Sequence, residues 1–304
     1  AYYIDSVAHM GFNVTPRFDA LAKDGALFTR HYSAEKRTID GAQAIVTGIP
    51  SVRSIGNLGY GLEIKANGNL GEIAKNNGYE AMMMHTSRRR SYYMDAVANA
   101  LGFTFYGAED IPIIMDYPDP EAPAYGWDYD GLMKLEDILD NTDKPFIAVF
   151  MSGTTHPTYP ELYAPFNKRL GNRTDLNSFL NTLEYSDYSV GEFIEKASGK
   201  EWFKNTVFII TADHASTAAA NYPSFDYTYL APLLIYSPDN IAPGEYTHVT
   251  IHLDLLPTIM DLAGLQGRTY TSSRHVFEGN ERAFVGDNGI YSVVTPVATS
   301  TIHS

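Results

Sequence analysis

Short apolar runs, separated by helical patterns, constrain the fold of this chain more than any other feature of its sequence. The clearest runs are residues 80–84, 145–151, 206–211 and 232–236, and a weaker one is 282–285. They are continuous rather than alternating, which is typical of strands covered by helices on both faces of a sheet. The helical patterns cover residues 16–26, 69–77, 92–101, 130–140, 175–197 and 253–263. This alternation predicts an α/β fold with a mostly parallel central sheet and helices on both faces.

The helical patterns begin and end at residues that favour such ends. Thr15 followed by Pro16 suits a helix start, because threonine is a favoured N-cap and proline fits the first turn. Gly25, Gly78 and Gly264 stand where helices should end. These signals support the predicted helix positions.

Composition excludes several classes of protein. The 304 residues carry a net charge of −14, so electrostatic binding of nucleic acid is not expected. The absence of cysteine excludes disulfides, thiolate metal sites and a cysteine-derived nucleophile. No stretch reaches the roughly 18 uninterrupted apolar residues of a membrane span. The chain begins at Ala1 without a methionine, and we interpret it as a fragment whose upstream part is absent.

The strongest local signal is an Asp-His pair at the end of an apolar run. Residues 206–211 lead directly into Ala212, Asp213 and His214. Ligands of open α/β sheets bind just beyond the carboxyl ends of strands, and a carboxylate beside an imidazole suits Zn²⁺ or Mn²⁺. The alternative is a capping aspartate followed by a surface histidine, since the dipeptide is common.

A polar loop followed by a helix of small residues places Thr38 at a helix start. A hydroxyl there meets free backbone N–H groups and the positive end of the helix dipole, which favour an anion or alkoxide. A neighbouring metal ion could turn that hydroxyl into a nucleophile. Taken alone, Thr38 is explained better as an ordinary N-cap.

Four segments, taken in order, resemble the alkaline phosphatase/sulfatase superfamily, and most of all its lipoteichoic-acid-synthase-like phosphoglycerol transferases. They are residues 14–33 with their Thr-Pro start, 206–214 with the Asp-His pair, 230–238 and 252–264. The resemblance implies a sulfatase-like catalytic domain over residues 1–264, with its first strand missing. Residues 265–304 would form a small C-terminal subdomain that completes the same unit.

The resemblance also implies roles for matched residues. Thr38 would be the nucleophile that becomes a phospho-threonine and would ligate the metal together with Asp213 and His214. His156 would be catalytic and contact the substrate, and His85 would be a second substrate-contacting residue. Imidazoles at these strand ends can protonate a leaving alkoxide or bind phosphoryl oxygens. The alternative for each histidine is a hydrogen-bonded loop residue.

The run of arginines at residues 88–90 could clamp a phosphate, and Arg88 is our candidate for substrate binding. A solvated surface is the alternative, because three adjacent arginines cannot all face one ligand.

Two positions depart from the family pattern. The first metal ligand of the family is an acidic residue on the first strand, and we expect it upstream of Ala1, since Asp5 is the only acid before Thr15. The synthases also have a Trp and an Arg after the histidine that His85 matches, where this chain has Tyr92 and Met94. The second departure puts a phosphatidylglycerol headgroup in doubt.

The sequence therefore predicts a metal-dependent phosphotransferase of the bacterial envelope that uses Mn²⁺ or Zn²⁺ and moves a phosphoglycerol-type group. Its substrate would be a phospholipid headgroup or a phospho- or sulfo-glycan. It would lie extracytoplasmically and associate with the membrane through a segment absent from this chain. The alternatives are a sulfatase or phosphodiesterase of the same superfamily, or a degenerate domain that binds a glycan or partner. Residues 38–42 lack the Cys or Ser, the Pro and the Arg that classical sulfatases have at the corresponding positions.

Overall fold

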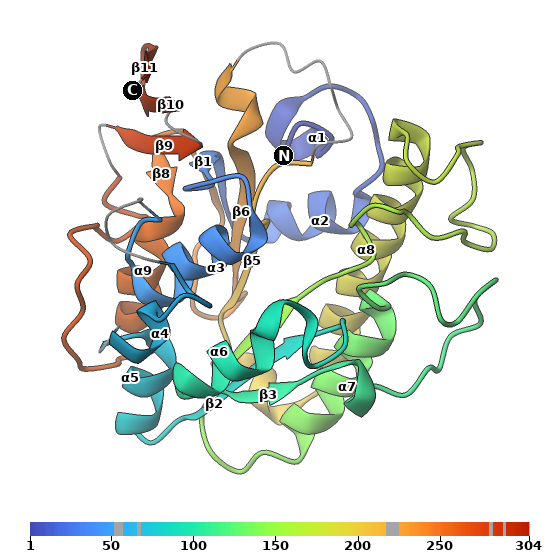
Figure 1. The fold of residues 1–304 in the computed structure, drawn as a ribbon, viewed down its shortest axis with the longest axis horizontal. Coiled ribbons are helices and arrows are strands. Elements are labelled where there is room, and N and C mark those ends of the chain that lie inside the picture. The colour runs from blue at the N-terminus through green and yellow to red at the C-terminus, as the bar shows by residue number, and fades with distance from the viewer. Residues whose placement is uncertain (52–56, 66–67, 217–224, 280–281, 288–289, 304) are drawn as a thin grey trace.

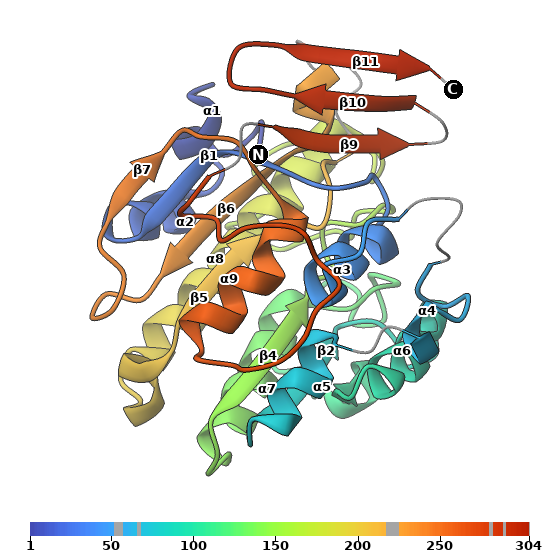
Figure 2. The same cartoon turned by 90° about the vertical axis from the view of Figure 1, so that its left-hand side faces the viewer.

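The computed structural model describes residues 1–51, 57–65, 68–216, 225–279, 282–287 and 290–303. Helices cover both faces of the sheet strands that cross the molecule (Figures 1 and 2). The helices on one face are α3 (Thr38–Thr47), α5 (Leu70–Asn76), α6 (Met94–Ala100) and α9 (Leu255–Leu262). Those on the other are α2 (Pro16–Leu21), α7 (Asp128–Asp140) and α8 (Leu176–Ala197). The shorter helices are α1 (Asp5–Ala8) and α4 (Leu62–Lys65).

The sheet strands form two ladders. In the first, β2 (Glu80–His85) lies between β3 (Thr104–Tyr106) and β4 (Phe146–Met151), and all three are parallel. In the second, the order is β5 (Phe208–Thr211), β6 (Leu230–Tyr236), β1 (Ala26–Tyr32) and β7 (Gly244–Tyr246), with β8 (Thr250–Ile251) also on β1. Strand β6 runs antiparallel to both β5 and β1, whereas β7 and β8 are parallel to β1. The predicted α/β class is confirmed, with one antiparallel strand inside the sheet.

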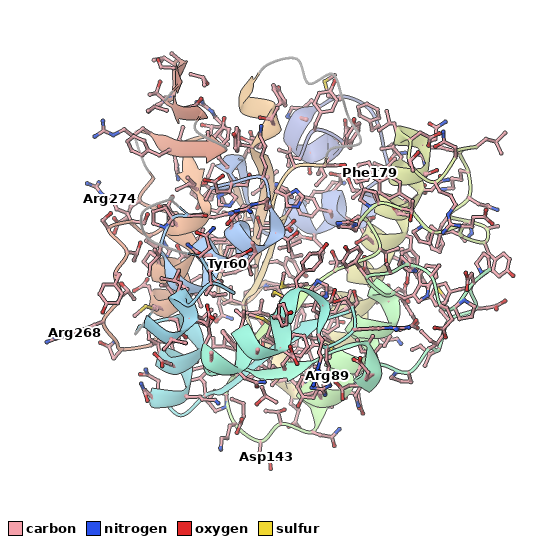
Figure 3. All side chains as sticks on the ribbon, viewed as in Figure 1. Tyr60, Arg89, Asp143, Phe179, Arg268 and Arg274 are labelled. Carbon is pink, nitrogen blue, oxygen red and sulfur yellow. The ribbon has the colours of Figure 1, made fainter. Side chains whose placement is uncertain are left out.

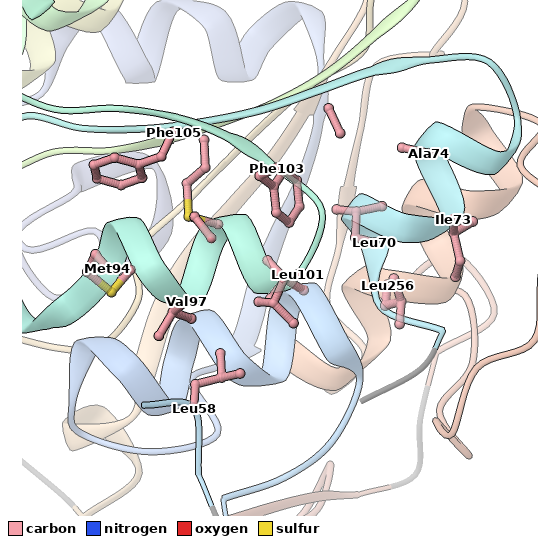
Figure 4. Close-up of a cluster of buried hydrophobic side chains, with 14 of the residues drawn as sticks. Leu58, Leu70, Ile73, Ala74, Met94, Val97, Leu101, Phe103, Phe105 and Leu256 are labelled. Atoms are coloured by element: carbon pink, nitrogen blue, oxygen red, sulfur yellow. The ribbon is translucent and has the colours of Figure 1, made fainter. Parts of the chain in front are cut away.

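Strand β2 separates two hydrophobic clusters. Ala81 and Met83 point into a cluster with α3, α5, α6 and α9, part of which is drawn in Figure 4. Met82 and Met84 point the opposite way, into a cluster with α7 and α8. Successive side chains of a strand alternate between faces, so a continuous apolar run can serve two cores. Each such buried side chain contributes about 1.5–3 kcal/mol.

The strands β4 and β5 differ from the expectation of full burial. Every residue of β4 and of β5 is partly exposed, whereas β2 and β6 are almost entirely buried. The reason is position: among the described residues, β4 pairs only with β2 and β5 only with β6, so each is the edge of its ladder.

The segment predicted as one helix over residues 16–26 is an α-helix only in its first part, and strand β1 begins at its last residue. Helix α2 ends at Leu21, a 3₁₀ turn follows to Asp24, and β1 begins at Ala26. The cause is Gly25, which is extended and lies so close to β6 that a Cβ there would be 2.8 Å from Leu234 Cδ1. Strand β1 was not predicted.

Helix α6 begins at Met94 rather than at residue 92. Tyr92 and Tyr93 have φ angles of 52° and 56°, which an α-helix does not accommodate. The ends predicted at Gly78 and Gly264 are confirmed, with φ angles of 82° and 64°.

The last strands form an antiparallel sheet. They are β9 (Ala283–Asp287), β10 (Ile290–Val294) and β11 (Thr299–His303). Ala283, Val285 and Val294 are buried in the same cluster as Phe18 and Leu27. The C-terminal strands therefore pack on the core of the preceding residues.

Candidate active site

Thr38 is the first residue of α3, and its side chain does not cap the helix. The N-cap is Arg37, and no side-chain capping bond is present. The hydroxyl Oγ1 lies 3.3 Å from Nε2 of His214. The ordinary N-cap alternative for Thr38 is therefore wrong, because the hydroxyl faces the Asp-His pair instead of the helix backbone.

Helix α3 reaches this position because of Gly41. A Cβ at residue 41 would lie 2.3 Å from the carbonyl oxygen of Asp213. Only a glycine permits this approach, which brings the first turn of α3 against the residues that follow β5. Asp40 fixes the same turn, since its buried carboxylate accepts from Arg37 Nε and from Ser51 Oγ.

The tautomer of His214 leaves Nε2 free to act as a ligand. Nδ1 lies 2.9 Å from the carbonyl oxygen of Ala215, so it must carry the proton and donate. The lone pair of Nε2 then faces Thr38 Oγ1. Asp213 accepts the backbone N–H of His214 through Oδ1, and its Oδ2 lies 3.4 Å from the same Nε2.

Two separations, from His214 Nε2 to Thr38 Oγ1 and to Asp213 Oδ2, match those between ligands of one divalent cation. A hydrogen bond between a hydroxyl and an imidazole is usually about 2.7–2.9 Å long, so 3.3 Å is long for one. Two donors that are each about 2.05 Å from a tetrahedral ion lie about 3.3 Å apart. Within the described ranges no group of three His, Asp or Glu side chains could hold a metal. The fit therefore depends on the Thr38 hydroxyl as the third donor.

His252 holds the backbone just before the Asp-His pair. Its Nε2 donates to the carbonyl oxygen of Ala212 at 2.9 Å, and its Nδ1 accepts from the N–H of Ala34 at 3.4 Å. The imidazole is fully buried, and burial lowers its pKa to about 4. His252 is therefore neutral and connects β1 to the loop that carries Asp213.

The stability of the protein should fall as the pH falls from 6.5 to 4. Burial lowers the pKa values of both His252 and His85 to about 4, so the unfolded chain binds more protons than the folded one in this window. The carboxyl of Asp187, whose pKa burial raises to about 6, acts in the opposite sense between about pH 4 and 6. Glutamine can still donate and accept hydrogen bonds. We expect His252→Gln to reduce the slope of the unfolding free energy against pH by up to about 1.4 kcal/mol per pH unit.

Urea unfolding at a series of pH values, with EDTA present so that metal release does not contribute, measures this slope. The exposed residue His9, changed to Gln, is the control and should leave the slope unaltered. A His252→Gln variant with the slope of the parent protein would contradict the assignment.

His85 ends strand β2 and carries a hydrogen on Nε2. Its Nδ1 accepts the backbone N–H of Ser87 at 3.0 Å, so in the neutral ring Nε2 carries the hydrogen. Burial lowers its pKa to about 4, Asp213 raises that pKa and His156 lowers it, so both groups lie within electrostatic reach. His85 is thus a neutral hydrogen-bond donor.

His156 follows β4 and has the opposite tautomer. Its Nδ1 lies 2.5 Å from the carbonyl oxygen of Pro157, which leaves Nε2 as the acceptor. The turn before it is fixed by Asp128, whose buried Oδ1 accepts the backbone N–H groups of Gly153 and Thr154. Strands β2 and β4 are parallel with His85 opposite Met151, so both histidines lie at the same edge of the sheet.

The arginine run divides between solvent and structure. The Arg88 side chain is 81% exposed, with Glu121 4.0 Å away. Arg89, labelled in Figure 3, bonds to Asp110 at 2.5 Å and to the carbonyl oxygen of Phe105 in β3. Arg89 therefore ties β3 to the loop after it and is not available to a ligand.

Sequence reasoning missed Asp128 and Tyr125, which support the His156 turn. Asp128 lies just before the helix predicted over residues 130–140, and Tyr125 lies in a Pro-rich stretch before it. No local pattern marks either residue, because their partners at residues 153–156 are distant in sequence.

Comparison with known proteins gives the family and the fold of this chain. Residues 6–265 match the family model described as Sulfatase. Phosphoglycerol transferase I of Salmonella typhi is 29% identical over 219 residues, which cover 66% of this chain and 28% of that protein. The match thus spans less than a third of the length of this relative.

Two solved structures resemble this one over almost its whole length. A protein in the alkaline phosphatase superfamily from Vibrio parahaemolyticus superposes with a TM-score of 0.81 at 22% identity, covering 99% of this chain and 76% of that one. The lipoteichoic acid synthase LtaP from Listeria monocytogenes gives a TM-score of 0.77 at 18% identity, covering 94% and 77%.

The fold is therefore that of the alkaline phosphatase superfamily. The chain belongs to the Sulfatase family, since that family model covers most of its length. The resemblance inferred from the four ordered segments is confirmed. In the part of the chain that the structure describes, no helix has the length and apolar character needed to cross a bilayer.

Proposed function

We propose that this domain transfers a phosphoglycerol-type group through a phospho-threonine intermediate on Thr38. The observation that carries the proposal is the convergence of Thr38 Oγ1, Asp213 Oδ2 and His214 Nε2, with separations of 3.3 and 3.4 Å. The similarity to phosphoglycerol transferase I and to LtaP supports the choice of transferred group.

These three residues would hold a divalent cation, Mn²⁺ or Zn²⁺. When bound there, the ion lowers the pKa of the Thr38 hydroxyl and offsets negative charge on the phosphoryl group. The neutral imidazole of His85 donates Nε2–H to a phosphoryl oxygen. Arg88, which is exposed, would be a further cationic contact to the same group.

The transfer takes two balanced displacements at phosphorus. In the first, the ionised Thr38 oxygen forms a bond to phosphorus, the bond to the donor alcohol breaks, and the leaving alkoxide takes a proton from Nε2 of His156 in its doubly protonated form, which leaves the neutral ring with its hydrogen on Nδ1. In the second, the acceptor hydroxyl gives its proton to His156 Nε2 and attacks phosphorus, and the Thr38 oxygen leaves. His156 ends in its starting protonation state.

The natural setting follows from the same proposal. A phospholipid headgroup or a phospho-glycan would be the substrate, and the domain would lie outside the cytoplasm, held at the membrane by a part of the protein outside residues 1–304. Acceptor and donor would then meet at the edge of the sheet that carries His85 and His156.

Intact-mass spectrometry tests the covalent step. The protein, loaded with Mn²⁺, is mixed with phosphatidylglycerol in detergent micelles and quenched in acid at short times. We expect a mass gain of one phosphoglyceryl unit, and peptide mapping should place it on Thr38. Turnover with the adduct on a residue other than Thr38 would overturn the assignment of Thr38 as the nucleophile.

A further inference from the structure

Tyr125 packs directly on the imidazole that the proposed function uses for proton transfer. The ring centroids of Tyr125 and His156 are 4.0 Å apart, with an angle of 45° between the rings. His156 is otherwise exposed, and the one hydrogen bond that the structure records for its imidazole is to the neighbouring Pro157 carbonyl. The Tyr125 ring is thus the surface against which this exposed imidazole is oriented.

The backbone of Tyr125 is fixed to both histidine loops. Its carbonyl oxygen accepts from Thr86 Oγ1 at 2.6 Å, one residue after His85. A Cβ on Gly153 would lie 1.9 Å from that same carbonyl oxygen. The chain at Tyr125 is therefore wedged between the loop after β2 and the loop after β4, and it cannot move without moving both.

The next residue tightens this wedge. Gly126 has a φ of 81°, and a Cβ on it would lie 1.8 Å from the carbonyl oxygen of Thr86. A side chain at that position would displace the loop after β2. Two glycines, Gly126 and Gly153, therefore permit the close approach of the chain at Tyr125 to the loops after β2 and β4.

The hydroxyl of Tyr125 is held as well. It lies 2.8 Å from the hydroxyl of Tyr92, and the two rings are nearly parallel, at 9°. Burial and this hydrogen bond raise the pKa of Tyr125 to about 12, so the phenol stays neutral. Tyr92 itself is 68% exposed and stands on the left-handed turn before α6.

We propose that Tyr125 is a positioning residue: its backbone is wedged between the two histidine loops, and its ring orients His156 so that Nε2 faces the reacting group. This inference rests on the proposed function only for the role of His156; the orientation itself can be measured without turnover. The ring does the orienting, and the bond to Tyr92 limits rotation of that ring.

Kinetics of matched variants test the role. We expect Tyr125→Ala to lower kcat about 10- to 100-fold with little change in KM, because a misdirected base fails at the chemical step. Tyr125→Phe, which keeps the ring, should stay within about threefold of the parent protein. Tyr125→Ala added to His156→Ala should lower kcat no further, since both changes act through the same imidazole.

NMR of selectively ¹⁵N-labelled histidine supplies a readout besides activity. In the parent protein His156 should show one tautomer, protonated at Nδ1, and in Tyr125→Ala a mixture of the two, while Tyr125→Phe retains the single tautomer. An unchanged tautomer in Tyr125→Ala, or a further loss of kcat in the His156→Ala background, overturns the proposal. If the parent protein transfers no phosphoglycerol, the proposed function fails, and the NMR result still decides whether Tyr125 orients His156.

Discussion

Replacement of Thr38 by alanine is expected to lower kcat by at least about 10³-fold and to abolish the covalent adduct, because the attacking oxygen is removed. Thr38→Ser, which keeps a hydroxyl at the same position, should retain measurable transfer and form the adduct. Steady-state assays and intact-mass spectrometry on the same preparations measure both effects.

The fold of the Thr38→Ala variant should be intact. Its side chain makes no capping bond, so its loss should change the free energy of unfolding by less than the roughly 1 kcal/mol typical of a removed cap. A melting temperature close to that of the parent protein, together with lost turnover, would show that the substitution affects the chemical step and not the fold. Turnover undiminished in Thr38→Ala would reject Thr38 as nucleophile.

Gly41→Ala is expected to damage both the fold and the metal site. The added Cβ would meet three backbone atoms of Asp213, the nearest at 2.3 Å and the others at 3.0 and 3.2 Å, and backbone cannot rotate away. Overpacking of this kind costs about 1–3 kcal/mol. A displacement of about 1 Å between Thr38 and Asp213 would weaken transfer by about 10²-fold.

Thermal unfolding and calorimetric titration with Mn²⁺ measure the two effects of Gly41→Ala. Gly199→Ala is the matched control, since a Cβ there would have only the Lys196 carbonyl oxygen near it, at 3.7 Å. Gly41→Ala with unchanged Mn²⁺ affinity and melting temperature would show that α3 can shift freely, contrary to the close packing described above.

The elements that could be predicted are those whose apolar pattern is unbroken. The runs that became β2, β4, β5 and β6 have few polar residues, so their strand character is visible locally. Strand β1 was missed because Thr29, Arg30 and His31 interrupt its apolar pattern, yet His31 is completely buried in the structure. Its burial depends on pairing with β6, which no local pattern reveals.

The residues of the candidate site, like the strands, could be predicted from the sequence only in part. Thr38, Asp213 and His214 stand at the ends of elements inside recognisable segments, so sequence reasoning could propose them together. Their proximity itself depends on Gly41, whose contact with Asp213 is a tertiary fact. Tyr125 could not be assigned a role, because its contact with His156 is set by the path of an irregular loop.

Thr38 and His214 are 176 positions apart in the chain, and an ion bound to both would act as a cross-link between its two halves. Such a link exists only in the native state, so it would stabilise the protein by about 2.7 kcal/mol at an ion concentration of 100 times Kd. The supply of divalent cation would then govern how long the domain resists proteolysis as well as whether it turns over substrate.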